Sequence, residues 1–267
     1  MANRGPLMGV AVLVAVLGVL VVVGGVLGVG PLASTTPADQ VTDPREMIAR
    51  SLQSVLDANA VRLDATVSGT IPGALLGRPE ERVVLDGTTA QVDLRPRDAR
   101  TGASVDSRPL DVTLETVTVW DGAWYRTPPD GPWSRASLGG AAADAGIDAN
   151  PLTLVDRLRS WLAQPALDPT VTDVPCASES GTCRHIVLEA GTDPADLLGA
   201  LLPDDNGSIL PEVATTITLD ADTGTLRPVH LELDMRSEDG SVDMQVALDA
   251  SRWDDPGIVV EEPPSGS

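Results

Sequence analysis

The chain has 267 residues and a formal net charge of −21 at pH 7, and every basic residue is arginine. All 39 acidic residues follow residue 30, so the rest of the chain is strongly negative. Such a surface repels nucleic acid and gains nothing from anionic lipid head groups, which excludes nucleic-acid binding. The roughly 235 residues after residue 30 suffice for one large domain or two small ones.

An uncharged apolar run occupies residues 8–30 and raises the question of membrane attachment. Its 23 residues match the roughly 20 that a spanning helix needs, whereas the apolar core of a signal peptide has about 7–15. Arg4 precedes the run and no cysteine follows it closely, so N-terminal lipidation is excluded. We predict a transmembrane anchor with residues 1–7 in the cytoplasm and the rest of the chain outside. A cleaved signal peptide and a buried core helix are the alternatives.

Three helices are predicted from one repeated start signal. In each, Asp or Asn at the cap precedes proline at the first helical position, where the missing N–H group costs nothing. The starts are Asp43-Pro44, which follows a polar linker over residues 31–43, then Asn150-Pro151 and Asp193-Pro194. The predicted buried stripes are Ile48, Leu52, Val55, Leu56 and Asn59 in the first helix, Val155, Leu158, Trp161 and Leu162 in the second, and Leu197, Leu198, Leu201 and Leu202 in the third.

Most of the remaining segments alternate between apolar and polar residues with a period of two, which predicts strands. Residues 61–71 show this pattern, and residues 229–248 show it twice around an Asp239-Gly240 turn, a strong hairpin signal. Two further tight turns are predicted in "VWDGAWYR" and "LDADTGTLRPV", and the polar run "RPRDARTGASVDSRP" is predicted to be an exposed loop. We expect an α+β fold in which helices cover the apolar face of an antiparallel sheet.

Cys176 and Cys183 are the two cysteines of the chain. Two cysteines in an exported protein favour a disulfide, and here they flank a Ser/Glu/Gly turn ahead of an apolar run. A metal site is the alternative, but it needs further ligands, and only His185 is near in the sequence. We predict a Cys176–Cys183 disulfide and no metal site.

An ordered set of segments spans residues 44–264. It comprises "REMIARSLQSVLDA" leading into "VRLDATVSG", the "VTVWDGAWYR" hairpin, "LVDRLRSWL" before the cysteine pair, then "ITLDADTGTLRPVHLELD" and "VALDASRWDDPGIVVEEPP". This set resembles the LolA-like half-barrel, and within it the LppX/LprG lipoprotein family. The resemblance implies a curved antiparallel sheet wrapped over helices, of which this sequence predicts about three. The transmembrane helix predicted from residues 8–30 would precede this domain. The extracytoplasmic domain is then expected over residues 44–262, with a tail over residues 263–267.

The family holds acyl chains of lipids or lipoglycans between the sheet and the helices, and the resemblance implies such a ligand here. We expect the cavity wall to include Leu158, Trp161, Leu198 and Leu202, although each also suits an ordinary packed core. The lipidated cysteine that tethers most members is missing, and the predicted membrane helix would replace it. Some relatives of the fold sense envelope stress through a protein partner. A sensor or interaction module with a filled core is therefore the alternative function.

Catalytic groups are hard to assemble from this sequence. His185 and His230 lie in strand-like segments, and no GxSxG, HExxH or P-loop motif is present. The Asp-Thr-Gly tripeptide that begins at Asp222 suits a hairpin turn, since an aspartic protease would need a second matching carboxylate. We predict a non-catalytic protein at the cell membrane that needs no cofactor. An exported hydrolase is kept as a third possibility.

Overall fold

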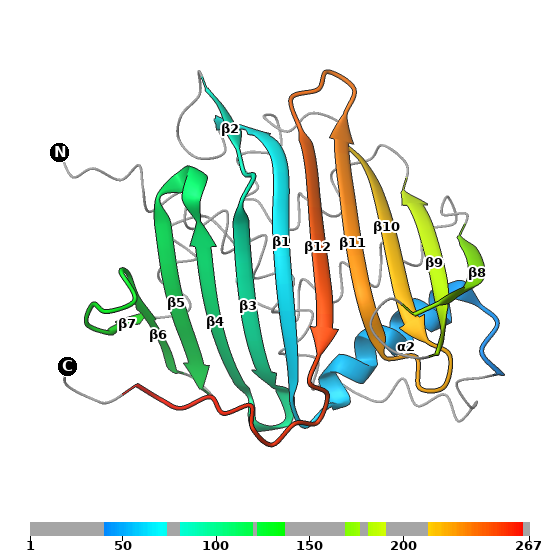
Figure 1. Ribbon diagram of the computed structural model, residues 1–267, viewed down its shortest axis with the longest axis horizontal. Helices are drawn as coiled ribbons and strands as arrows, with labels where there is room; N and C mark the ends of the chain where they lie inside the picture. Colours follow the sequence, from blue (N-terminus) through cyan, green and yellow to red (C-terminus); the bar gives the residue numbers. More distant parts are fainter. Residues whose placement is uncertain are drawn as a thin grey trace.

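The computed structural model describes residues 40–73, 81–119, 122–136, 169–176, 181–190 and 213–263. The described strands form one open, curved, 12-stranded antiparallel sheet, shown in Figure 1, which fits a half-barrel. Eleven of them follow the order β7-β6-β5-β4-β3-β1-β12-β11-β10-β9-β8, and β2 pairs with β1 off this path. The strands are β1 (Val61–Pro72), β2 (Arg82–Val84), β3 (Thr88–Arg95), β4 (Arg100–Ser107), β5 (Val112–Val119), β6 (Gly122–Arg126), β7 (Ser134–Ala136), β8 (Thr170–Pro175), β9 (Thr182–Ala190), β10 (Val213–Asp222), β11 (Pro228–Ser237) and β12 (Asp243–Ser251).

The central strand β1 confirms the alternation predicted for residues 61–71. Val61, Leu63, Ala65 and Val67 are each at most 6% exposed, and the residues between them point to the other face. β1 pairs with β3 on one side and with β12 on the other, and the predicted Asp239-Gly240 turn joins β11 to β12. The register aligns the apolar residues of all these strands on one face, which we call the apolar face. The opposite face is the polar face.

The polar run predicted as an exposed loop is largely a strand, so that prediction was wrong. β4 lies between β3 and β5, and its residues Val105 and Ser107 are buried. The hydroxyls of Ser107 and Thr88 are hydrogen-bonded at 2.8 Å, which satisfies both buried side chains. Two 3-10 turns, η3 (Pro96–Asp98) and η4 (Arg108–Leu110), flank the strand and supply the loop-like composition. Pairing on both sides outweighs the weak strand propensity of this segment.

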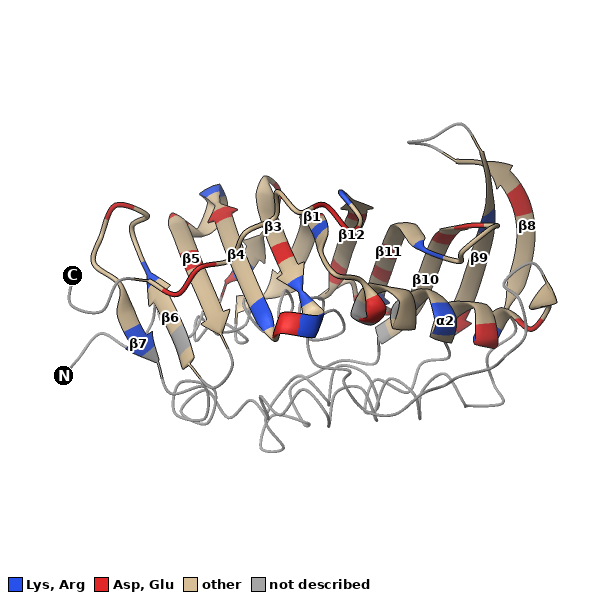
Figure 2. Ribbon diagram, turned by 90° about the horizontal axis from the view of Figure 1, so that it is seen from below, with Lys and Arg blue, Asp and Glu red and all other residues tan. Residues whose placement is uncertain are grey.

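The helix α2 (Pro44–Asp57) confirms the first predicted helix and its cap. Asp43 Oδ1 accepts a hydrogen bond from the Arg45 amide at 2.9 Å, and Pro44 is the first helical residue. Asn59 was predicted on the buried stripe but lies beyond the helix end, where its backbone amide donates to Asp254 at 2.8 Å. Figure 2 shows that α2 lies against one face of the sheet, toward the β9–β11 side. The helices predicted from Pro151 and Pro194 fall outside the described residues.

The segment after β12 runs along the ends of the central strands (Figure 1). Arg95 Nη1 donates to the carbonyl oxygen of Ile258, and Arg100 Nη1 donates to that of Val260, each at 2.9 Å. Ile258 and Val260 are 1% and 4% exposed. This segment therefore packs as part of the domain up to Pro263, the last residue described.

No helix within the described ranges is long and apolar enough to cross a membrane. The predicted anchor, residues 8–30, lies outside those ranges.

Gly69 marks the point at which β1 changes partner. Up to Val67 the strand pairs with β3, and from Thr70 onward it pairs with β2. Gly69 has a φ of +111°, and a Cβ there would overlap the backbone carbonyl of Asp243. Only glycine fits both the backbone angle and the close approach of β12.

We expect Gly69→Ala to lower the free energy of unfolding by at least about 2 kcal/mol, since backbone strain and overpacking add. The matched control is Gly240→Ala in the β11–β12 turn, where φ is +66° and no atom lies within 4 Å of the new Cβ. The control should cost only about 1 kcal/mol, from the left-handed backbone alone. Chemical denaturation measures both losses, and equal losses would contradict the proposed crowding at Gly69.

Candidate functional site

The apolar face carries two clusters of buried side chains. The central cluster gathers residues of β1, β2, β3, β4, β5, β11 and β12 with one residue of α2, and the edge cluster gathers residues of β9 and β10 with the start of α2. The central cluster is Val55, Val61, Leu63, Ala65, Val67, Ile71, Val83, Leu85, Ala90, Val92, Leu94, Val105, Leu114, Met235, Val242, Met244, Val246 and Leu248. The edge cluster is Val41, Met47, Ile48, Ile186, Leu188, Ile217, Leu219 and Leu226.

The helix α2 contributes to both clusters and carries a polar residue between them. Met47 and Ile48 belong to the edge cluster, and Val55 belongs to the central cluster. Ser51 lies between them on the same helix face and is 0% exposed. Its hydroxyl has no hydrogen-bond partner in the described part of the chain, a state that costs about 1–3 kcal/mol. The predicted stripe omitted Ser51 because a search for apolar residues passes over serine.

Two leucines of β11, Leu231 and Leu233, contact both clusters and yet stay partly exposed. We call this pair the seam. Their cross-strand neighbours on β10, Leu219 and Ile217, are 0% and 6% exposed. The corresponding residues of β12, Leu248 and Val246, are 6% and 1% exposed.

The exposure of the seam is not an effect of the sheet edge, because β11 is paired on both sides. Accessible apolar surface in the middle of a sheet, between two buried clusters, is surface that an apolar ligand can cover. Both leucines were predicted to point inward, but periodicity assigns a residue to a face and does not say how completely that face is covered.

The residues predicted to form a cavity wall, Leu158, Trp161, Leu198 and Leu202, lie outside the described residues, and their role stays a prediction. Trp253 was not predicted as a site residue, but it packs partly buried against the central cluster. Its ring also lies under the Arg227 guanidinium, whose carbon is 5.0 Å from the ring centre.

Solved structures with a similar fold are found, whereas no protein-family model and no curated protein matches the chain. Lipoprotein LppX of Mycobacterium tuberculosis matches with a TM-score of 0.50 and 16% identity, over 82% of this chain and 98% of LppX. The MucA/MucB complex of Pseudomonas aeruginosa matches with a TM-score of 0.35 and 12% identity, over 79% of this chain and 58% of that one. A LolA superfamily protein of Nitrosomonas europaea gives a TM-score of 0.27 and 11% identity, over 84% and 96%.

The described sheet shares its fold with LppX, as the sequence resemblance predicted. At 16% identity the match to LppX establishes the shared architecture and leaves the ligand open.

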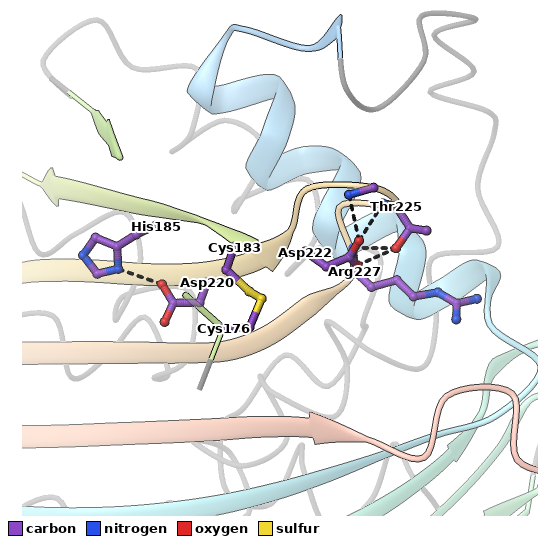
Figure 3. The surroundings of a disulfide bond; sticks show 8 residues. Cys176, Cys183, His185, Asp220, Asp222, Thr225 and Arg227 are labelled. Atoms are coloured by element: carbon purple, nitrogen blue, oxygen red, sulfur yellow. Dashed lines mark hydrogen bonds and ion pairs between the residues drawn. A yellow bond between two sulfur atoms is a disulfide. The ribbon is translucent and has the colours of Figure 1, made fainter. Parts of the chain in front are cut away.

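The predicted disulfide is confirmed in this LppX-like sheet. Cys176 and Cys183 are joined, with their Cα atoms 5.0 Å apart, and the bond ties the end of β8 to the start of β9 (Figure 3). Because each sulfur is bonded to the other, the alternative of a metal site on these two cysteines is ruled out. Beside the disulfide, His185 Nδ1 lies 2.7 Å from Asp220 Oδ1.

The Asp-Thr-Gly tripeptide forms the turn between β10 and β11, as predicted. Asp222 Oδ1 accepts hydrogen bonds from the amides of Gly224 and Thr225 at 3.0 and 2.7 Å, and Asp222 Oδ2 accepts one from the Arg227 amide at 3.0 Å (Figure 3). The carboxylate is therefore fully used in holding the turn.

The polar face of the LppX-like sheet carries paired charges. His230, predicted on this face, lies 2.8 Å from Asp249 and 3.5 Å from Glu232. Gln245 donates a hydrogen bond to Glu232 at 2.6 Å. In the described ranges neither histidine is hydrogen-bonded to a hydroxyl or thiol, and no three His, Cys, Asp or Glu side chains are grouped to hold a metal.

The charges around His230 set the direction of its pKa. Burial of the ring lowers the pKa, but the hydrogen bond and the charge of Asp249, together with Glu232 and Asp220, outweigh burial and raise it. The pKa of Asp234 is also raised, by burial and then by the neighbouring charge of Glu232.

Replacing both Cys176 and Cys183 by serine should lower the free energy of unfolding by about 2–3 kcal/mol, because the bond closes a short loop. The fold should survive, since pairing along the rest of β8 and β9 does not depend on the bond. Thermal melting of the variant measures the loss. Modification of both cysteines by a thiol reagent in native, unreduced protein would show that the bond is absent.

The His230 contacts should stabilise the fold more at low pH than at high pH. The folded-state pKa is raised above its ordinary value of 6.5, so the stabilisation is fully present below that value and is lost as the pH rises through the folded pKa. Asp249 is exposed, so the effect should be on the order of 0.5 kcal/mol. Chemical denaturation should be measured for wild type and for His230→Gln, at a pH below 6.5 and at a pH above the folded-state pKa. Wild type should have the higher free energy of unfolding, and this difference should shrink at the higher pH. A difference that grows at the higher pH would show that the pKa of His230 is lowered in the folded state.

Proposed function

We propose that this domain binds the acyl chains of a lipid-like ligand against its apolar face, centred on Leu231 and Leu233, and that it catalyses no reaction. The observation that carries the proposal is the seam, which is apolar, central in the sheet and incompletely covered. The LppX-like fold supports this assignment, because the family resemblance implies acyl chains on this side of the sheet. Leu158, Trp161, Leu198 and Leu202 would line the opposite wall.

The proposed setting is the outer side of the cell membrane. Residues 8–30 would anchor the chain, and residues 31–43 would link the anchor to the domain. The disulfide supports a compartment outside the cytoplasm, where such bonds persist. The ligand would be a lipid or lipoglycan delivered from the membrane, and the anchor would keep the domain near it.

The direct test is to fill the seam. Leu231→Trp should block uptake of a pyrene-labelled diacylglycerol and change the melting temperature little, because partly exposed surface can take up the added volume. The matched control is Leu219→Trp on the adjacent strand, at the position paired with Leu231. Leu219 is 0% exposed, so overpacking there should cost about 1–3 kcal/mol.

Two results would reject the proposal. One is a wild-type chain that takes up no labelled lipid. The other is a Leu231→Trp variant that is destabilised as much as Leu219→Trp, which would mean that the seam is packed. Either result would favour the alternative function, a sensor or interaction module with a filled core.

A further inference from the structure

The apolar face carries one pair of charged residues within the described strands. Inward positions of β1, β3, β4, β5, β10, β11 and β12 hold apolar residues, Ser, Thr or Gly. On β9, Arg184 stands opposite the inward Ala221, two residues before the inward Ile186. On β8, Asp173 stands opposite Arg184, so both side chains share this face. Figure 2 shows the acidic band of β8 next to the basic band of β9.

Within the described ranges, Asp173 contacts the Arg184 guanidinium through one of its nitrogen atoms. Arg184 Nη1 donates to Asp173 Oδ1 at 2.7 Å, and this is its one ion pair in the described ranges. The Asp173 side chain is 55% exposed, and that of Arg184 is 29% exposed. An ion pair this open to water contributes little stability. By contrast, Arg62 on the polar face engages Asp93 through two nitrogen atoms, at 2.6 and 2.7 Å.

Arg184 is held firmly beside the apolar surface. It follows Cys183 directly, so the disulfide fixes the backbone at this position. Its neighbours on the same face, Ala221 and Ile186, are both 0% exposed. Leu219 is paired with Ile186 on β9 and with Leu231 on β11, so the three residues form one row across the sheet. Arg184 lies two residues before Ile186. The strand spacing and the rise per residue therefore place Leu231, in the seam, about 12 Å from Arg184. An acyl chain on the seam can span that distance.

We propose that Arg184 binds the anionic group, a phosphate or carboxylate, of an acylated ligand whose chains lie on the apolar face. The proposal rests on the proposed function and adds the chemical class of the ligand's polar end. The guanidinium presents five N–H donors in a planar fork that matches the oxygens of phosphate and carboxylate. Asp173 accepts a hydrogen bond from one of these donors. A ligand oxygen with more negative charge and better geometry would displace the Asp173 carboxylate from that donor.

The test compares two probes with identical chains, pyrene-labelled phosphatidic acid and pyrene-labelled diacylglycerol. The full-length chain, held in a non-ionic amphipol, is titrated with each, and bound probe is read from pyrene emission excited through tryptophan. Wild type should prefer the phosphatidic acid by about tenfold. Arg184→Gln should abolish this preference and leave diacylglycerol binding unchanged. Asp173→Asn should strengthen binding of phosphatidic acid alone.

The control variant is Arg126→Gln, which removes an arginine paired with Glu115 on the polar face and should change neither affinity.

If wild type binds neither probe, the proposed function itself fails. If wild type binds both equally, or if Arg184→Gln weakens both together with the melting temperature, acyl binding stands and the assignment of Arg184 is wrong. Inorganic phosphate alone should not raise the melting temperature. If it does so through Arg184 and displaces phosphatidic acid, the site takes free anions and the headgroup assignment is overturned.

Discussion

The pairing of β1 with β12 is the contact on which the rest of the sheet depends. On one side of it β1, β3, β4, β5, β6 and β7 follow one another as neighbours, and on the other side β8 to β12 do the same. Each half is built from antiparallel neighbours, most of them joined by short turns, while β1 and β12 come from opposite ends of the domain. A slip of one residue in this pairing would move the apolar residues of one half of the sheet to the opposite face, where they would be exposed to water. The close approach of β12 to Gly69 is one contact that exists only in this register.

Given that register, the two faces of the sheet differ in how many of their polar side chains have hydrogen-bond partners and in how fully their apolar side chains are covered. On the polar face, His185, His230 and Arg62 each contact a carboxylate, and cross-strand pairs hold most of these groups in place. On the apolar face, the Ser51 hydroxyl has no partner in the described part of the chain, the Arg184 guanidinium has one, and the seam keeps accessible surface. An apolar surface with a few polar groups that can still take a partner is the combination found in many ligand sites, which is consistent with the proposed function.

The sequence predicted those features whose signals are local. The Asp43 cap, the Asp239-Gly240 hairpin and the period-two strands depend on residues within a few positions of one another, and the structure confirms them. β4 was missed because its polar residues form a strand only between two partners. Leu231 was placed on the correct face, but its exposure depends on packing from elsewhere in the chain. Arg184 and Asp173 escaped notice because only the β8–β9 register reveals that both point to the apolar face.

The strong negative charge of the chain, −21 at pH 7, bears on how an anionic ligand could reach Arg184. Repulsion between exposed charges is largely screened beyond about 8 Å at physiological ionic strength. The carboxylates of the polar face lie across the sheet from the apolar face, so they act on a bound headgroup mainly at longer range. Within the described ranges, Asp173 is the carboxylate that contacts Arg184, and its charge is already neutralised by this arginine. On the proposed function, an acyl chain would therefore bring the anionic group in by its own burial, and Arg184 would then fix the end of the chain. Hydrophobic burial would supply most of the affinity, and the single cation would supply the orientation.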